Sequence, residues 1–194
     1  MRLTDSEAFD GKPAFSPDGQ KIAFRSDRDS IGEIYAMNAD GSGLVRLTNN
    51  GALDDEPAFS PDGQKIAFYS TRTGNGDVYV MNADGSGQTR LTGNVGRDEQ
   101  PAFSPDGQKI AFTNNESGDL EILVRNADGS GQVGLTNNAF ADLAPSWGPA
   151  YTPCQGKAAT IAGSDSSQAI SGTPGPDVIA GRGGDDTIKG LDGA

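Results

Sequence analysis

The stretch "PAFSPDGQKIAF" occupies residues 13–24 and returns letter for letter at 57–68 and 101–112. Its opening proline repeats every 44 residues, at Pro13, Pro57, Pro101 and Pro145. The segment "NADGSG" keeps the same step, at 38–43, 82–87 and 126–131. A fixed period of this length predicts a propeller or a solenoid, in which each repeat packs on its neighbours.

Hydrophobic alternation inside the repeat predicts strands. The segments "KIAFRS" (21–26) and "EIYAMN" (33–38) alternate with a period of two and are bounded by turn-forming residues. The stretches "SPDG" and "NADGSG" carry proline, aspartate and glycine where tight turns need them. We therefore expect an all-β fold in which each repeat is one propeller blade of four antiparallel strands. In the first repeat these strands are expected at 13–16, 21–26, 33–38 and 44–48.

The number of repeats predicts an open propeller segment. Residues 1–4 match the last strand of a blade, and residues 145–147 match the first strand of another, with three complete blades between them. Closed propellers typically have four to eight blades. Either the chain is a fragment of a longer protein or several copies assemble into a ring. In both cases we expect the terminal blades to offer unpaired faces for self-association.

The repeat also carries a family resemblance. Over residues 1–149 the pattern "RLT…D…PAFSPDGQKIAF.S…G…IYVMNADGSG…RLT" resembles the blade motif of TolB-like, WD40-like propellers. The resemblance implies a rigid platform for protein partners, or a gate attached to a separate catalytic domain. The sequence contains no G-x-S-x-G motif and no histidine, so nothing in it matches the attached hydrolase.

Composition narrows the classes of function. The formal net charge of −12 makes nucleic acid and anionic membranes unfavourable partners, and no apolar run reaches the roughly 20 residues of a membrane span. The N-terminus lacks the apolar core of a signal peptide. The absence of histidine removes the commonest general base and imidazole metal sites. The single cysteine, Cys154, either pairs with a cysteine in a longer chain or remains a free thiol.

One acidic position recurs in every repeat. An aspartate precedes each repeat-opening proline by three residues, at Asp10, Asp54, Asp98 and Asp142. Because this stretch leads into the innermost strand, the four carboxylates could ring one mouth of the axial channel and bind a cation or a basic peptide. The alternative is that each aspartate accepts hydrogen bonds from its own turn. Its presence in every blade favours the second interpretation.

A nine-residue repeat follows the propeller, after a segment at 150–162 that is expected to be a linker. Glycines recur at Gly163, Gly172, Gly181 and Gly190, and isoleucines at Ile170, Ile179 and Ile188. The stretches "GTPGPDVIA" and "GRGGDDTIK" resemble the RTX (hemolysin-type) nonapeptide repeat. That resemblance implies a short parallel β-roll over residues 163–194, with calcium held between glycine-rich turns.

The spacing of this repeat predicts incomplete calcium sites. One coil of such a roll takes two nonapeptides, so ligands that face each other across a calcium ion lie 18 residues apart. Asp186 then faces Gln168, and Asp177 faces position 195, one residue beyond Ala194. The expected ligands are Asp177, Asp186, Gln168 and the turn glycines Gly172, Gly175, Gly181 and Gly184. We therefore expect Ca²⁺ as the cofactor, bound weakly by this chain.

These patterns favour a non-catalytic bacterial binding or scaffold protein, because weak calcium sites fill only where calcium is millimolar. The expected location is extracellular or at the cell surface, with the periplasm also open. The partner would be an unidentified protein or a cell-surface component, without nucleic acid or membrane insertion. An alternative is the propeller part of a larger secreted hydrolase or lyase whose catalytic residues lie outside this chain. A spacer in a large adhesin is a third hypothesis.

Overall fold

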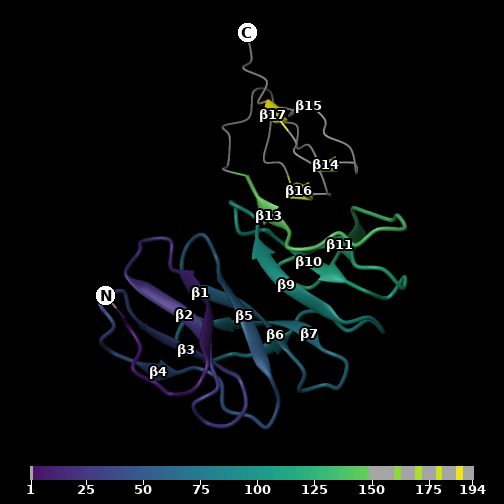
Figure 1. Ribbon diagram of the computed structural model, residues 1–194. Helices are drawn as coiled ribbons and strands as arrows, with labels where there is room; N and C mark the ends of the chain where they lie inside the picture. Colours follow the sequence, from purple (N-terminus) through teal and green to yellow (C-terminus); the bar gives the residue numbers. More distant parts are fainter. Residues whose placement is uncertain (1, 149–159, 163–168, 172–177, 181–186, 190–194) are drawn as a thin grey trace.

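A computed structural model describes residues 2–148 and the short segments 160–162, 169–171, 178–180 and 187–189. This part of the chain contains strands and turns and no helix. Its main feature is a series of three four-stranded antiparallel sheets, one per 44-residue repeat (Figure 1). The structure thus confirms the all-β fold and the three complete blades.

Each blade has three strands of six residues and a fourth strand of two. The strands of the first blade are β1 (Asp10–Phe15), β2 (Lys21–Ser26), β3 (Glu33–Asn38) and β4 (Val45–Arg46). Those of the second blade are β5 (Asp54–Phe59), β6 (Lys65–Ser70), β7 (Asp77–Asn82) and β8 (Thr89–Arg90). Those of the third blade are β9 (Asp98–Phe103), β10 (Lys109–Asn114), β11 (Glu121–Asn126) and β12 (Val133–Gly134).

The two central strands have the predicted bounds, whereas the outer two differ. Strand β1 begins at Asp10, three residues before the predicted start at Pro13. A β-bulge accommodates the proline within the strand, because Gly11 pairs with Arg25 and Ala14 with Ala23. Proline has no N–H to donate, and at a bulge the strand does not need a hydrogen-bond donor at that position. Strand β4 ends early because the N–H groups of the two residues after Arg46 both donate to one carbonyl oxygen of β3.

The hydrophobic core lies between neighbouring blades. The face of the first blade that packs on the second is built from Ala23, Ile34, Ala36 and Leu47. It meets the larger side chains Ile66, Phe68, Tyr79 and Met81 of the second blade. The second and third blades pack in the same way, with Ile110 and Phe112 against Ala67, Val78 and Val80. Both faces of the central strands are therefore largely buried in the second blade, as in sheets stacked face to face, whereas one face of β11 in the third blade is half-buried.

The N-terminal residues pack as a preceding blade would. Residues 2–4, expected as a strand, form none, but Leu3 lies against the cluster of Ile22, Phe24, Tyr35 and Met37. The backbone of Leu3 also approaches Gly41, as the backbone of Leu47 approaches Gly85 one repeat later. Leu3 thus occupies the position that the last strand of a preceding blade would fill.

Beyond the third blade, β13 (Ser146–Trp147) begins a fourth repeat and pairs antiparallel with β16 (Val178–Ala180) of the nine-residue repeat. The pairs are Ser146 with Ile179 and Trp147 with Val178. In the third blade the positions 44 residues earlier, Ala102 and Phe103, pair with β10 in the same antiparallel sense. Strand β16 therefore lies where the second strand of a fourth blade would lie.

The remaining short strands pair in parallel. Strand β14 (Thr160–Ala162) pairs with β16, and β15 (Ala169–Ser171) pairs with β17 (Thr187–Lys189). The partners are offset by 18 residues, as in Ile161 with Ile179 and Ile170 with Ile188. Strand β14 falls inside the segment 150–162 that was expected to be a linker, because Ile161 already keeps the nine-residue phase of the later isoleucines.

Candidate functional site

The repeated aspartates lie at the start of the first strand of each repeat or just before it. Asp54 and Asp98 begin β5 and β9 and are fully buried, as is Asp142 shortly before β13. The side chain of Asp10, at the start of β1, is 10% exposed. None of the described contacts joins one of these aspartates to another.

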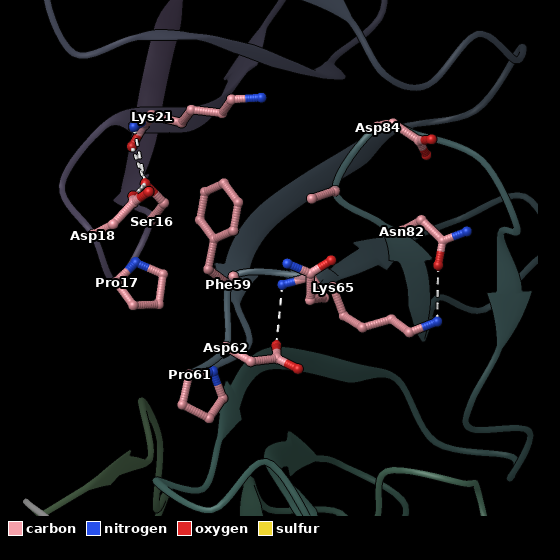
Figure 2. A pocket seen from close by; sticks show the side chains of 13 residues that line it. Ser16, Pro17, Asp18, Lys21, Phe59, Pro61, Asp62, Lys65, Asn82 and Asp84 are labelled. Carbon is pink, nitrogen blue, oxygen red and sulfur yellow. Dashed lines mark hydrogen bonds between the residues drawn. The ribbon is translucent and has the colours of Figure 1, made fainter.

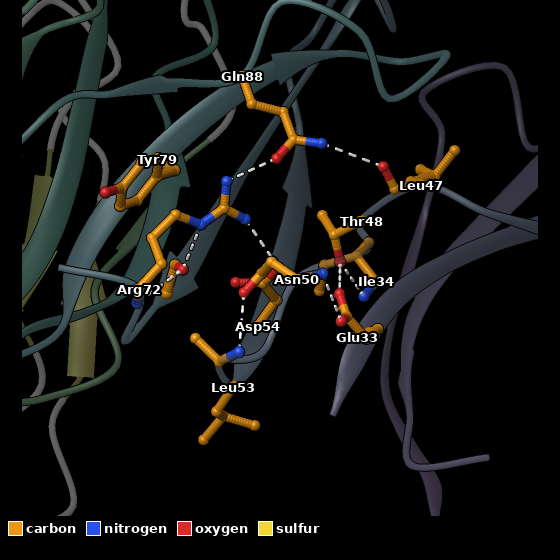
Figure 3. A network of polar contacts seen from close by, with 12 residues as sticks. Glu33, Ile34, Leu47, Thr48, Asn50, Leu53, Asp54, Arg72, Tyr79 and Gln88 are labelled. Atoms are coloured by element: carbon orange, nitrogen blue, oxygen red, sulfur yellow. Dashed lines mark hydrogen bonds and ion pairs between the residues drawn. The ribbon is translucent and has the colours of Figure 1, made fainter. Parts of the chain in front are cut away.

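The contacts of Asp54 show what this position does (Figure 3). Its Oδ2 accepts hydrogen bonds from the Asn50 amide at 2.6 Å and from the Arg72 guanidinium at 2.8 Å. Arg72 also donates to Gln88, whose amide donates to the carbonyl oxygen of Leu47 at 3.1 Å. The aspartate thus anchors a polar network that ties the second blade to the end of the first.

The other three aspartates make corresponding contacts. Asp142 accepts from the Asn138 amide at 2.6 Å, just as Asp54 accepts from Asn50. Asp10 is paired with Arg28 at 3.2 Å. The Asn138 contact is local, four residues before Asp142, whereas Arg28 lies 18 residues after Asp10, between β2 and β3. Among the described residues, no group of three or more acidic or sulfur-bearing side chains is arranged to hold a metal ion.

A second set of buried carboxylates was missed from the sequence. The first residue of the third strand in each blade is acidic and at most 3% exposed, at Glu33, Asp77 and Glu121. Glu33 accepts hydrogen bonds from the Thr48 hydroxyl at 2.5 Å and from the Asn50 N–H at 2.9 Å (Figure 3). The 44-residue spacing of these three residues was the signal that could have revealed them.

The third blade differs electrostatically from the other two. The position of Arg28 and Arg72 is taken by Glu116. Among the described residues no arginine donates a hydrogen bond to Asp98, which accepts instead from the Asn114 amide at 2.6 Å. Burial raises the pKa of the Asp98 carboxyl, while its hydrogen bonds oppose the shift. The sequence shows this substitution once the copies are aligned.

This difference leads to a prediction for Asp98→Asn. A carboxyl group whose pKa is raised by folding takes up its proton first in the folded state, so its contribution to stability grows as the pH falls. We expect the free energy of unfolding of the wild type to rise relative to that of Asp98→Asn as the pH falls from 7 to 4. At pH 7 the two values should differ by less than about 1 kcal/mol. Urea unfolding of both proteins across this range measures it. A constant difference would contradict the prediction.

Asp10→Asn is the matched control with the opposite sign. Burial of Asp10 opposes ionisation, but hydrogen bonds from Ser26, Thr4 and Arg28 hold its pKa below the ordinary value. Its stabilising contribution is therefore present above the unfolded pKa and is lost as the pH falls through the folded one. We expect Asp10→Asn to be destabilised by about 1 kcal/mol at pH 7, and this penalty to shrink towards pH 3.

The innermost strands meet along a shallow groove of about 300 Å³. In each repeat the residue before the proline has a positive φ, at Lys12, Glu56, Gln100 and Ala144. The Gln100 N–H donates to the Glu56 carboxylate at 2.8 Å, and the Ala144 N–H donates to the Gln100 side chain at 2.7 Å. Lys12 pairs with Glu56 at 3.3 Å. The groove therefore holds a ladder of polar contacts in which Lys12 donates to Glu56, while Glu56 and Gln100 each accept a hydrogen bond from the following repeat.

Larger grooves lie between the turns of neighbouring blades. The first, of about 820 Å³, lies between the "SPDG" turns of blades one and two (Figure 2). Its lining includes Pro17, Pro61 and the Phe59 ring, together with Lys21 and Asp84. A second groove, of about 570 Å³, repeats this arrangement between blades two and three. In both grooves a few apolar side chains, such as Phe59 in the first and Phe103 in the second, lie among polar and charged ones of both signs. Peptide-binding surfaces combine apolar and polar contacts in this way.

The seven predicted calcium ligands lie outside the described residues: Gln168, Gly172, Gly175, Asp177, Gly181, Gly184 and Asp186. What the structure describes nearby is the pair of parallel strand contacts, β14 with β16 and β15 with β17.

The three stacked antiparallel sheets define an open β-propeller segment. The chain belongs to the TolB β-propeller family, because the family model described as TolB beta propeller domain matches residues 1–154. A TolB structure from Acinetobacter baumannii is 27% identical, with a TM-score of 0.64 over 73% of this chain. One from Agrobacterium tumefaciens, assigned to TolB, is 26% identical, with a TM-score of 0.63 over 73% of this chain.

The chain spans 36% of the first of these proteins and 56% of the second. An oligogalacturonate lyase from Vibrio parahaemolyticus is 14% identical, with a TM-score of 0.59 over 76% of this chain and 46% of its own. At that identity the likeness shows the fold alone. No helix long and apolar enough to cross a membrane occurs among the described residues.

Proposed function

We propose that this chain is a non-catalytic scaffold that binds a protein partner outside the cytoplasm, at the cell surface, in the periplasm or in the surrounding medium. The observation that carries the proposal is the pair of repeated grooves between blade turns, of about 820 Å³ and 570 Å³. Membership of the TolB propeller family supports it. The grooves sit on a rigid frame, because every blade pair shares a continuous buried core.

Lys21→Glu tests this function. Lys21 lines the first groove, and its charge reversal should weaken binding of a groove-seated protein by roughly tenfold. Lys109→Glu is the matched control, since Lys109 occupies the same position in the third blade and lines neither groove. Binding partners isolated from the envelope of the source bacterium are measured against both variants. Equal binding of the two variants would contradict the proposal.

We further propose that the nine-residue repeat forms a β-roll that binds Ca²⁺ weakly in this chain. The phased glycines and aspartates support this, as does the 18-residue offset between the paired short strands. Asp186 and Gln168 would face each other, and Asp177 would need a ligand beyond Ala194. Weak binding of this kind fits only a compartment in which calcium is millimolar.

A calorimetric calcium titration tests the β-roll. We expect this chain to bind more weakly than about 100 μM, and a version extended by two nonapeptides of the form "GGDGDDTIK" to bind at least about tenfold more tightly. Micromolar affinity in the unextended chain would show that the 18-residue pairing is wrong. If neither protein bound calcium, the calcium proposal would fail and the scaffold proposal would stand.

The alternative, in which this propeller belongs to a larger secreted hydrolase or lyase, rests only on fold neighbours of low identity. No particular contact in the described residues favours it.

A further inference from the structure

The third blade lacks an arginine that the first two blades share. In the first blade Arg46 contacts buried Glu33 at 2.8 Å, and in the second Arg90 contacts buried Asp77 at 2.9 Å. The position 44 residues after Arg90 is Gly134. The carboxylate of the third blade therefore has no arginine from its own blade.

That carboxylate, Glu121, keeps the orientation of its counterpart. The Asn138 N–H donates to its Oε1 at 2.7 Å, as the Asn50 N–H donates to Glu33 Oε1 at 2.9 Å. In the first blade the same Oε1 also accepts from Arg46. Glu121 is 97% buried, and its Oε2 has no hydrogen-bond partner among the described residues. In the first blade Arg46 contacts Oε1 of Glu33 and the Thr48 hydroxyl donates to Oε2, so among the described residues Glu121 has neither the arginine nor the hydroxyl of its counterpart. Such a carboxylate would be stabilised by a donor with several N–H groups.

The acceptor geometry selects a guanidinium group. Arg46 donates from Nε to the carbonyl oxygen of Thr48 at 2.7 Å while its terminal nitrogen contacts Glu33. The third blade retains both acceptors, the Glu121 carboxylate and the carbonyl oxygen of Thr136. Thr136 lies two residues after Gly134, as Thr48 lies two residues after Arg46. The planar fork of arginine donates in two directions at once, which an ammonium group does with less geometric control.

There is room for this group at the surface. Apart from the residues next to it in the chain, the only described atom within 4 Å of a Cβ built on Gly134 is the Thr136 carbonyl oxygen, at 3.9 Å. In the other blades the arginine side chain reaches this position from the solvent side, with Arg90 still 38% exposed. Gly134, which takes the place of that arginine in the third blade, is exposed.

The same region carries exposed apolar side chains. Phe140 is 58% exposed and lies two residues after Asn138, where the earlier blades have Gly96 and Ala52. Leu143 is 47% exposed, in a position that is acidic in the second and third repeats. A buried charge acceptor beside exposed apolar groups has the composition of an interface hot spot for arginine.

We propose that Glu121 and the Thr136 carbonyl form a receptor site for an arginine side chain presented by a protein partner. The inference rests on the proposed scaffold function and adds the chemistry of the contact. The partner's guanidinium takes the place that Arg46 and Arg90 fill in the other blades. The overall charge of −12 favours a basic partner.

The test uses the whole chain and two probe peptides, acetyl-Gly-Arg-Gly-amide and acetyl-Gly-Lys-Gly-amide, titrated by NMR. We expect saturable shifts at the amides of Gly134 and Asn138 with the arginine peptide, and binding at least about tenfold weaker with the lysine peptide. Gly134→Arg, which supplies the arginine internally, and Glu121→Gln should each lose the response. Gln132→Arg adds the same charge on the neighbouring surface and should keep it.

Equal affinity for the two peptides, or an undiminished response in Gly134→Arg, would overturn the site. Gly134→Arg restores the pair of the other blades, so loss of folding is not expected to explain its result. Binding measurements with a protein partner distinguish failure of the receptor site from failure of the scaffold function. If it binds wild type and Gly134→Arg equally, the receptor site is refuted although the scaffold function stands. If the arginine peptide binds but no protein does, the site stands and the scaffold function fails.

Discussion

Phe68→Ala should lower the free energy of unfolding by about 3–5 kcal/mol, because it removes a large, fully buried side chain from between two blades. Phe68 packs in the cluster that joins the first and second blades and contacts the Tyr79 ring at a centroid distance of 5.8 Å. The residues on both sides of the cavity belong to two hydrogen-bonded sheets, and neither sheet can move inward to fill it without losing its other packing contacts. Urea unfolding followed by circular dichroism measures the loss.

The repeat supplies an internal comparison in Phe24, the equivalent residue of the first blade. Phe24 packs with Ile22, Tyr35 and Met37, and is covered by Leu3 and the residues around it rather than by a whole described blade. These N-terminal residues form no strand and can move inward to fill a cavity. We expect Phe24→Ala to cost about 2 kcal/mol, less than Phe68→Ala. Equal losses would show that the interface between blades adds nothing to this position.

The parts of the fold that could be predicted are those set by local sequence. Strands β2 and β3 have the predicted bounds because alternation and turn chemistry lie within the same 18 residues. The bulge at Pro13 could not be predicted in the same way, since a proline is compatible both with the start of a strand and with a bulge inside one. The 44-residue period fixed the number of blades but not the bends within a strand.

The polar network was harder to predict because its members are distant in sequence. Arg72 and Asp54 are 18 residues apart, and Gln88 reaches a carbonyl 41 residues earlier, in the preceding blade. No local pattern pairs such residues. The departures of the third blade, at Glu116 and Gly134, are visible in the sequence, but their meaning depends on knowing which carboxylates they leave without an arginine.

A glycine repeated in one turn of each blade also contributes to the joining of neighbouring blades. In each repeat a glycine with φ near +90° lies in the "NADGSG" turn, at Gly41, Gly85 and Gly129. Each lies against the leucine of the preceding "LT" pair, respectively Leu3, Leu47 and Leu91. The glycine thus serves both its own turn and the approach of the neighbouring backbone. Substitution with alanine separates these two requirements.

Gly85→Ala should be the most damaging of the three substitutions, at about 3–4 kcal/mol. An added Cβ would lie 2.8 Å from the Leu47 carbonyl oxygen and 3.1 Å from the Leu47 Cα, so two blades would have to separate. At Gly129 the nearest atom of Leu91 is 3.8 Å away, and only the cost of the positive φ, about 1–2 kcal/mol, remains.

Gly41→Ala should fall between these values, because the carbonyl oxygen of Leu3 is 3.1 Å from the added Cβ but belongs to N-terminal residues that can yield. Gly19, with φ +69° and nothing within 4 Å of its Cβ, is the control for backbone strain alone. Urea unfolding of all four alanine variants gives the ranking. If Gly85→Ala lowered the free energy of unfolding no more than Gly19→Ala, the Leu47 backbone would not be held as close to Gly85 as the structure shows. That result would contradict the close stacking of the first two blades.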